Sequence, residues 1–91
     1  WRFQRAEIDI IATEDEELIV VEVKTRSSRK YESPEDSVTL RKQQLLVKAA
    51  NAYIQQHEIE LECRFDIISI IMNEQQEFEI EHIKNAFYPL L

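Results

Sequence analysis

Two short stretches decide the fold of this chain: residues 7–11, Glu-Ile-Asp-Ile-Ile, and residues 20–24, Val-Val-Glu-Val-Lys. Isoleucine and valine favour strands, and the turn-forming residues 13–17, Thr-Glu-Asp-Glu-Glu, lie between the two stretches. The pattern therefore predicts an antiparallel hairpin. Burying a carboxylate among such residues costs several kcal/mol unless a cation, a metal or strong donors lie nearby.

The charged side chains of these two strands are predicted to converge. Side chains alternate faces along a strand, so Glu7 and Asp9 share one face of the first stretch, and Glu22 and Lys24 share one face of the second. A register that places Asp9 opposite Glu22 also places Glu7 opposite Lys24, which would gather three carboxylates and one ammonium group. Because like charges repel, a divalent cation is the usual partner of such a cluster.

The remaining elements follow from periodicity and turn signals. The order predicted is strand, strand, helix, strand, strand, at residues 3–12, 17–25, about 39–57, 62–72 and 78–83. We expect strand 62–72 to be central and buried on both faces. The faces opposite the acidic side chains, with Ile8, Ile10 and Ala12 on the first strand and Ile19, Val21 and Val23 on the second, are expected to meet the helix. Since glycine is absent, the turns should depend on Asn, Asp and Ser or on longer loops without positive φ.

The spacing of Asp9, followed by Glu22-x-Lys24 on the next strand, resembles the PD-(D/E)xK nuclease superfamily. A longer ordered set of motifs resembles the YraN family of predicted bacterial endonucleases, which are distantly similar to archaeal Holliday-junction resolvases. These motifs are Ala-Glu-Ile-Asp-Ile-Ile-Ala (6–12), Val-Glu-Val-Lys-Thr-Arg-Ser (21–27), Ser-Pro-Glu (33–35), Arg-Phe-Asp (64–66) and Ala-Phe (86–87). They span nearly the whole chain.

The resemblance implies an α/β fold with a restriction-endonuclease-like core. In that core a mixed β-sheet is flanked by helices in the order β-β-α-β-β, here as one domain over residues 1–91. The family has an N-terminal helix before the position of Trp1, so we expect the natural domain to begin upstream of this sequence.

The resemblance also implies catalytic roles for Asp9, Glu22 and Lys24. Asp9 and Glu22 would hold Mg²⁺ or Mn²⁺, ions that suit hard oxygen ligands in a site without His or Cys. Lys24 would orient the attacking water and stabilise charge on the phosphate. Three interpretations of Glu7 stay open: an outer-sphere acid, a third ligand through water, or the partner of Lys24.

Net charge is −7, which argues against a nucleic-acid partner, but the charge is unevenly distributed. Residues 24–48 contain seven basic and three acidic residues, a net charge of +4, directly after the catalytic lysine candidate. The side chains that we assign to phosphate contacts are Arg26, Arg29, Lys30 and Lys42. A solvated basic surface is the alternative for most of them.

Three other residue types have structural interpretations. Asp66 lies near the start of the strand predicted at 62–72 and is expected to pair with Arg64 or to cap a loop, and His57 and His82 are expected at the surface. The single cysteine, Cys63, cannot form an internal disulfide, which favours a cytoplasmic location. No apolar run approaches the roughly 20 residues of a membrane span.

Three functions remain open on the sequence alone. The first is a metal-dependent endonuclease that hydrolyses DNA phosphodiester bonds, with the resemblance implying branched DNA and a homodimer. The second is a non-catalytic nucleic-acid-binding module of the same fold. The third is a protein-interaction domain in which the charged side chains form a structural ion network.

Overall fold

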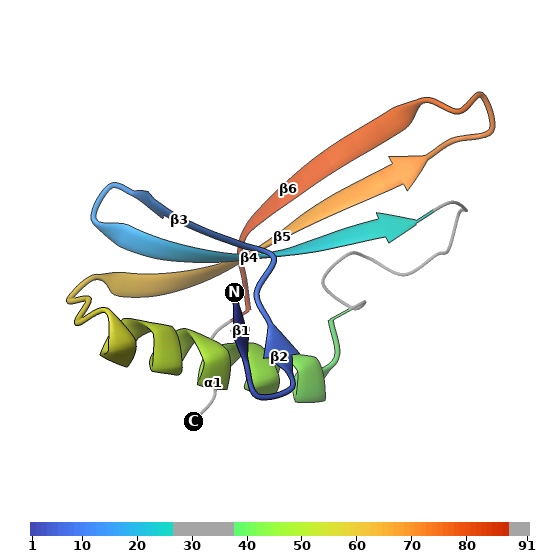
Figure 1. Ribbon diagram of the computed structural model, residues 1–91. Coiled ribbons are helices and arrows are strands. Elements are labelled where there is room, and N and C mark those ends of the chain that lie inside the picture. Colours follow the sequence, from blue (N-terminus) through green and yellow to red (C-terminus); the bar gives the residue numbers. More distant parts are fainter. Residues whose placement is uncertain (27–37, 88–91) are drawn as a thin grey trace.

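The computed structural model describes residues 1–26 and 38–87, and these residues form one helix packed against a mixed β-sheet (Figure 1). Their α/β arrangement follows the predicted order, with an additional small hairpin at the N-terminus. The elements are β1 (Arg2–Phe3), β2 (Ala6–Glu7), β3 (Ile10–Glu14), β4 (Glu17–Arg26), α1 (Leu40–Gln56), β5 (Glu62–Met72) and β6 (Phe78–Phe87).

The main sheet has the strand order β3-β4-β5-β6. Strands β3 and β4 pair antiparallel, β4 and β5 pair parallel, and β5 and β6 pair antiparallel. Parallel neighbours cannot be joined by a tight turn, so the chain crosses between β4 and β5 through α1. The predicted mixed sheet is therefore confirmed, and β6 is longer than the strand predicted at 78–83.

The strand predicted over residues 3–12 is interrupted. Residues Arg2 and Glu7 pair in a separate two-stranded hairpin, whose turn has Gln4 at a φ of 53°. The chain then bends at Asp9 and joins the main sheet at Ile10, which lies opposite Val21. This is the predicted register, but it begins after Glu7, so the predicted placement of Glu7 opposite Lys24 is wrong.

Helix α1 covers the face of the sheet that carries Glu22. Thr39 caps the helix and accepts a hydrogen bond from the Lys42 N–H at 3.2 Å. One cluster of buried side chains joins the helix to Val20, Phe65 and Ile67 of the sheet. Glu22 points to the same side as Val20, two residues away, so the prediction that the helix meets the opposite face is wrong for β4. Ile8 does pack in the same cluster as the helix residues, as predicted. Both faces of β4 are apolar, and periodicity could not distinguish them.

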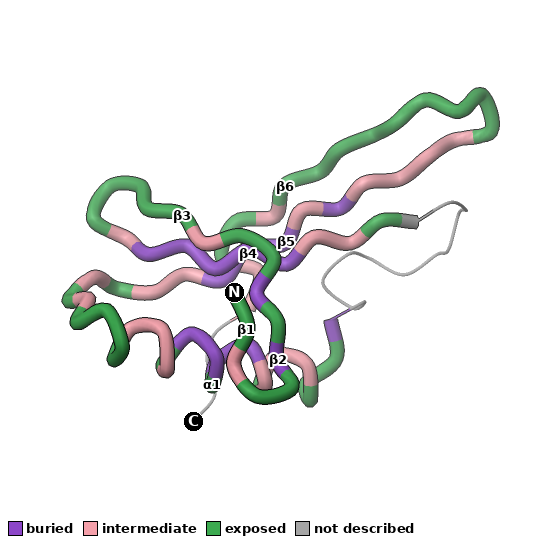
Figure 2. Tube along the Cα trace, in the orientation of Figure 1, coloured by how far each residue is buried: buried purple, intermediate pink, exposed green. Residues whose placement is uncertain are grey.

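The opposite face of the sheet is only partly covered by described residues. Ile68 and Ile70 of β5 are half-buried, and Ile80 of β6 is 71% exposed. Figure 2 shows the buried residues gathered at the centre of the sheet and the inner side of α1, while most of β6 is exposed. The prediction that β5 is buried on both faces is therefore wrong for the part of the chain described. Within residues 1–26 and 38–87, no helix has the length and apolar character needed to cross a bilayer.

The turn between β3 and β4 uses left-handed backbone without glycine. Its two central residues, Asp15 and Glu16, have φ values of 49° and 64°, while Glu14 and Glu17 pair on either side. Positive φ at both central positions defines a type I′ turn, which matches the twist of antiparallel strands and favours glycine at the second position. The expectation that the turns depend on Asn, Asp and Ser is therefore only partly confirmed.

Replacement of Glu16 by glycine should stabilise the protein by about 1 kcal/mol or less. The left-handed conformation costs an L-residue about 1–2 kcal/mol, and glycine avoids this cost. Glycine also loses more conformational entropy on folding, which cancels part of the gain. Urea unfolding of Glu16→Gly against wild type measures the change. Glu14→Gly, in the adjacent strand, is the control and should lower stability by about 0.5–1 kcal/mol. Equal loss of stability in both variants would contradict the turn assignment.

Candidate active site

The buried Glu22 carboxylate is the centre of the candidate site. Glu22 lies in the middle of β4 on the helix-covered face and is 4% exposed. Its Oε1 atom lies 3.0 Å from Lys42 Nζ and 3.7 Å from Lys24 Nζ. Its Oε2 atom is also buried, yet it accepts no hydrogen bond within the described part of the chain. A buried carboxylate oxygen without a donor is costly, and it marks a place where a ligand would be stabilised.

The two lysines reach Glu22 from different elements. Lys24 is two residues along β4 and shares the face of Glu22, as the alternation predicted. Lys42 is in the first turn of α1, so capping by Thr39 fixes its place above the sheet. Sequence reasoning assigned Lys42 to phosphate contacts and missed that it is the nearer cation to Glu22. The missing information was the face on which the helix packs.

Asp9 lies at the bend between β2 and β3. Its Oδ2 atom accepts a hydrogen bond from the Val23 N–H at 2.9 Å, so the carboxylate continues the strand ladder beyond Ile10. Asp9 is exposed, and it adjoins β4 at the residue that follows Glu22. The structure thus brings both acids to the same region of the β3–β4 pair, while a shared ion stays a prediction.

Glu7 does not join this pair of acids. Its carboxylate accepts a hydrogen bond from Arg2 at 3.3 Å within the β1–β2 hairpin. Consistent with this, no group of three or more His, Cys, Asp or Glu side chains that could hold a metal occurs among the described residues. Of the three acids in the predicted cluster, two, Asp9 and Glu22, are then left as possible metal ligands. That number suits Mg²⁺, which is usually held by one or two carboxylates together with waters and substrate phosphates.

A second buried oxygen without a partner lies on the same face. Ser69 of β5 is fully buried, pairs with Lys24 across the sheet, and has no hydrogen-bond partner for its Oγ atom in the described structure. Sequence reasoning passed over it, although a hydroxyl between two pairs of isoleucines was a signal. The polar region around Glu22 therefore extends to β5.

Three of the predicted phosphate contacts cannot be placed. The backbone of Arg26 ends β4, but its side chain lies outside the described structure, as do Arg29 and Lys30. Their assignment to phosphate contacts stays a prediction.

A second cluster of polar side chains surrounds Asp66 on the opposite face of the sheet. Asp66 is 1% exposed and accepts two hydrogen bonds from Arg64 at 2.9 Å each, as well as one from the Asn85 N–H at 2.9 Å. His82 Nε2 lies 2.8 Å from Asp66 Oδ2, and Arg64 also contacts Glu17 at 3.3 Å. The predicted pair with Arg64 is confirmed, whereas the contact with His82, sixteen residues away, was missed.

These contacts determine the charge state of Asp66. Burial alone would raise the pKa of its carboxyl group, but hydrogen bonds from Arg64, Asn85 and His82 hold the pKa below its usual value of about 3.8. The same bond to Asp66 raises the pKa of the Arg64 guanidinium. Burial raises the pKa of the Cys63 thiol to about 11, so this side chain stays uncharged at neutral pH.

Comparison with known proteins identifies close relatives of this chain. The family model described as "Uncharacterised protein family UPF0102" matches residues 1–70. UPF0102 protein FP2501 of Flavobacterium psychrophilum is 54% identical over 88 residues, which are 97% of this chain and 73% of the relative. A UPF0102 protein of Bacteroides thetaiotaomicron is 47% identical over 91 residues, which are 100% of this chain and 74% of the relative.

Replacement of Asp66 by asparagine should destabilise the protein at neutral pH, because Arg64 loses the counter-charge that accepts two of its hydrogen bonds. A carboxylate whose pKa is lowered by folding contributes stability above its unfolded value, and this contribution is lost as the pH falls through the folded value. The difference between wild type and Asp66→Asn should therefore shrink below about pH 3.8. Denaturant unfolding across the pH range measures it.

Glu79→Gln is the control for this experiment, because Glu79 is an exposed acid of the neighbouring strand β6. It should change stability by no more than about 0.5 kcal/mol at any pH. A difference between wild type and Asp66→Asn that is the same in acid as at neutral pH would contradict the lowered pKa.

Proposed function

We propose that this chain, which belongs to the UPF0102 family, is a metal-dependent endonuclease that hydrolyses DNA phosphodiester bonds. Family membership agrees with the resemblance to YraN that the sequence motifs carry. The relatives are named only by the family, so the activity is argued from the site. The observation that carries the proposal is the buried Oε2 atom of Glu22, which has no hydrogen-bond partner in the described structure. The ammonium groups of Lys24 and Lys42 contact the other oxygen, Oε1.

Asp9 and Glu22 are the residues that would hold Mg²⁺ or Mn²⁺. Asp9 uses one carboxylate oxygen for the Val23 N–H, which orients the group and leaves its other oxygen available. Glu22 offers Oε2. When bound, a divalent ion would polarise the phosphate and lower the pKa of the attacking water.

Lys24 and Lys42 provide positive charge on the substrate side. Lys24 Nζ, 3.7 Å from Glu22 Oε1, is close enough to contact a phosphate that is held beside Glu22 and to neutralise charge that develops during hydrolysis. Lys42 is 3.0 Å from the same oxygen and compensates the buried carboxylate when no divalent ion does so. Its long side chain is half-exposed, so it can turn to the phosphate when the charge of Glu22 is neutralised otherwise.

The topology supports a restriction-endonuclease-like core for the whole domain. The acid-bearing region joins β3 and β4, and α1 connects β4 to the parallel strand β5. DNA is the proposed substrate, and the cytoplasm, where a free thiol such as Cys63 persists, is the proposed location.

A purely structural ion network explains the site less well. In a network that serves only stability, each buried polar atom has a hydrogen-bond partner, because an unpaired buried atom destabilises the folded state. Glu22 and Ser69 each keep a buried oxygen without a partner among the described residues. Such atoms are expected where a ligand completes the contacts.

Replacement of either metal ligand should abolish cleavage without weakening DNA binding. In the full-length protein with Mg²⁺ or Mn²⁺, Asp9→Asn and Glu22→Gln should cleave branched or linear DNA at least about 100-fold more slowly than wild type. Affinity for DNA should stay similar or increase, because negative charge is lost near the phosphate. Glu14→Gln, an exposed acid of β3, is the matched control and should retain wild-type cleavage.

Metal binding is measured separately by the broadening of amide signals in NMR spectra with Mn²⁺. Wild type should show broadening at Asp9 and Val23 that is lost in Glu22→Gln. Full cleavage by Asp9→Asn would refute the metal-dependent mechanism. Binding of DNA by wild type without cleavage in either metal would instead indicate the non-catalytic module.

A further inference from the structure

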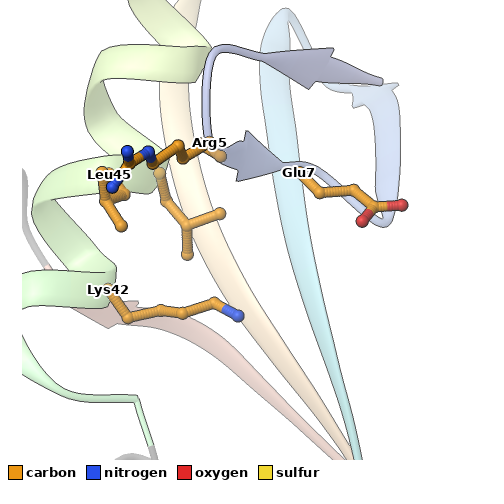
Figure 3. Close-up of a pocket in the computed structure, with 6 residues that line it drawn as sticks. Arg5, Glu7, Lys42 and Leu45 are labelled. Carbon is orange, nitrogen blue, oxygen red and sulfur yellow. The ribbon is translucent and has the colours of Figure 1, made fainter.

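A pocket of about 200 Å³ opens between the β1–β2 hairpin and the first turns of α1 (Figure 3). Its walls combine two cationic side chains, one acidic side chain and three apolar ones. The lining residues are Arg5, Ala6, Glu7, Lys42, Leu45 and Leu46.

The pocket adjoins the candidate active site through Lys42. The side chain of Lys42 lines the pocket, while its ammonium group lies 3.0 Å from Glu22 Oε1. A ligand group in the pocket would therefore share a lysine with a phosphate held beside Glu22.

Arg5 and Lys42 line the pocket with their charged ends extended in opposite directions, so the guanidinium of Arg5 is the group available to an anion there (Figure 3). Arg5 belongs to the turn of the hairpin, is exposed, and makes no ion pair with a described residue. Its guanidinium is suited to a phosphate, because its planar N–H groups donate two parallel hydrogen bonds. Glu7 is held by Arg2 at 3.3 Å, and Figure 3 shows its carboxylate pointing away from Arg5 and Lys42.

The remainder of the pocket is apolar and small. Ala6, Leu45 and Leu46 offer no hydrogen-bonding side chains, so they suit the carbon face of a sugar or base. A volume of about 200 Å³ is below the roughly 300–1,000 Å³ of pockets for drug-sized ligands, which limits the occupant to one nucleotide unit.

We propose that this pocket is a subsite for one nucleotide of the DNA strand, with its phosphate at the Arg5 guanidinium and its sugar or base against Leu45. The proposal rests on the endonuclease function and names where the nucleotide next to the cleaved bond is held. An unpaired nucleotide fits this subsite, because one base of a duplex remains stacked between its neighbours. The subsite therefore favours DNA with an unpaired strand near the cleaved bond.

Binding of a single nucleotide tests the subsite without any need for cleavage. Thymidine 5′-monophosphate, added to the isotope-labelled full-length protein without metal, should shift the NMR signals of Ala6 and Leu45. Thymidine and inorganic phosphate, added separately, should each bind at least about tenfold more weakly, since each makes only part of the contacts. Equal binding of inorganic phosphate, or shifts confined to residues away from the pocket, would overturn the proposal.

Two variants with opposite expected effects test the charges. Arg5→Gln should weaken binding of the nucleotide and of single-stranded DNA about tenfold, and should lower the salt dependence of DNA binding by about 0.7 in slope. Glu7→Gln should strengthen both, because a negative charge leaves the rim. Arg41→Gln removes the same charge from an exposed position of α1 outside the pocket and should leave nucleotide binding unchanged.

These outcomes separate the subsite from the proposed function. If Arg5→Gln and Arg41→Gln bind the nucleotide alike, the subsite is refuted, and cleavage by wild type would still support the endonuclease. If wild type does not cleave DNA in Mg²⁺ or Mn²⁺ but the nucleotide shifts Ala6 and Leu45, the endonuclease is refuted and the pocket stands as a nucleotide-binding site.

Discussion

The burial of the Glu22 carboxylate constrains the rest of this structure. A charge that is 4% exposed must be compensated locally, and among the described side chains of β4 the cation that contacts Glu22 is Lys24, at 3.7 Å. The nearer cation, Lys42, comes from α1, so the first turn of the helix has to lie over the middle of β4. The helix can approach closely because Ala49 and Ala50 face the sheet. Packing and charge compensation therefore require the same position of the helix.

Two aspartates allow the sheet to become irregular without unsatisfied backbone groups. Asp9 accepts the Val23 N–H where β3 has not yet begun, and Asp66 accepts the Asn85 N–H where the pairing of β5 with β6 is shifted. Buried backbone donors need acceptors, and these side chains replace the missing strand neighbours. Because Asp9 closes the ladder, the preceding residues can leave the sheet. That departure carries Glu7 and Arg5 to the side of α1, where they line the pocket.

Much of the fold could be predicted from the sequence because its signals are local. Periodicity and capping placed α1 and β5 within about a residue or two of their observed bounds, and the register beside Ile10 followed from the acidic pattern. Three features depended on contacts distant in sequence and could not be predicted. They are the face on which the helix packs, the departure of Glu7 with its positive φ at Gln4, and the contact of His82 with Asp66.

The charges around Glu22 differ from the net charge of the chain, which bears on the proposed binding of DNA. The positive groups near Glu22 come from two separate segments, with Lys24 in β4 and Lys42 in α1. Many of the acids that produce the net charge of −7 lie elsewhere, including the exposed face of β6. At physiological ionic strength, charges more than about 8 Å apart in solvent are largely screened. A phosphate beside Glu22 therefore experiences the nearby ammonium groups more strongly than the acidic remainder, and the acidic surface acts mainly on the rate of approach.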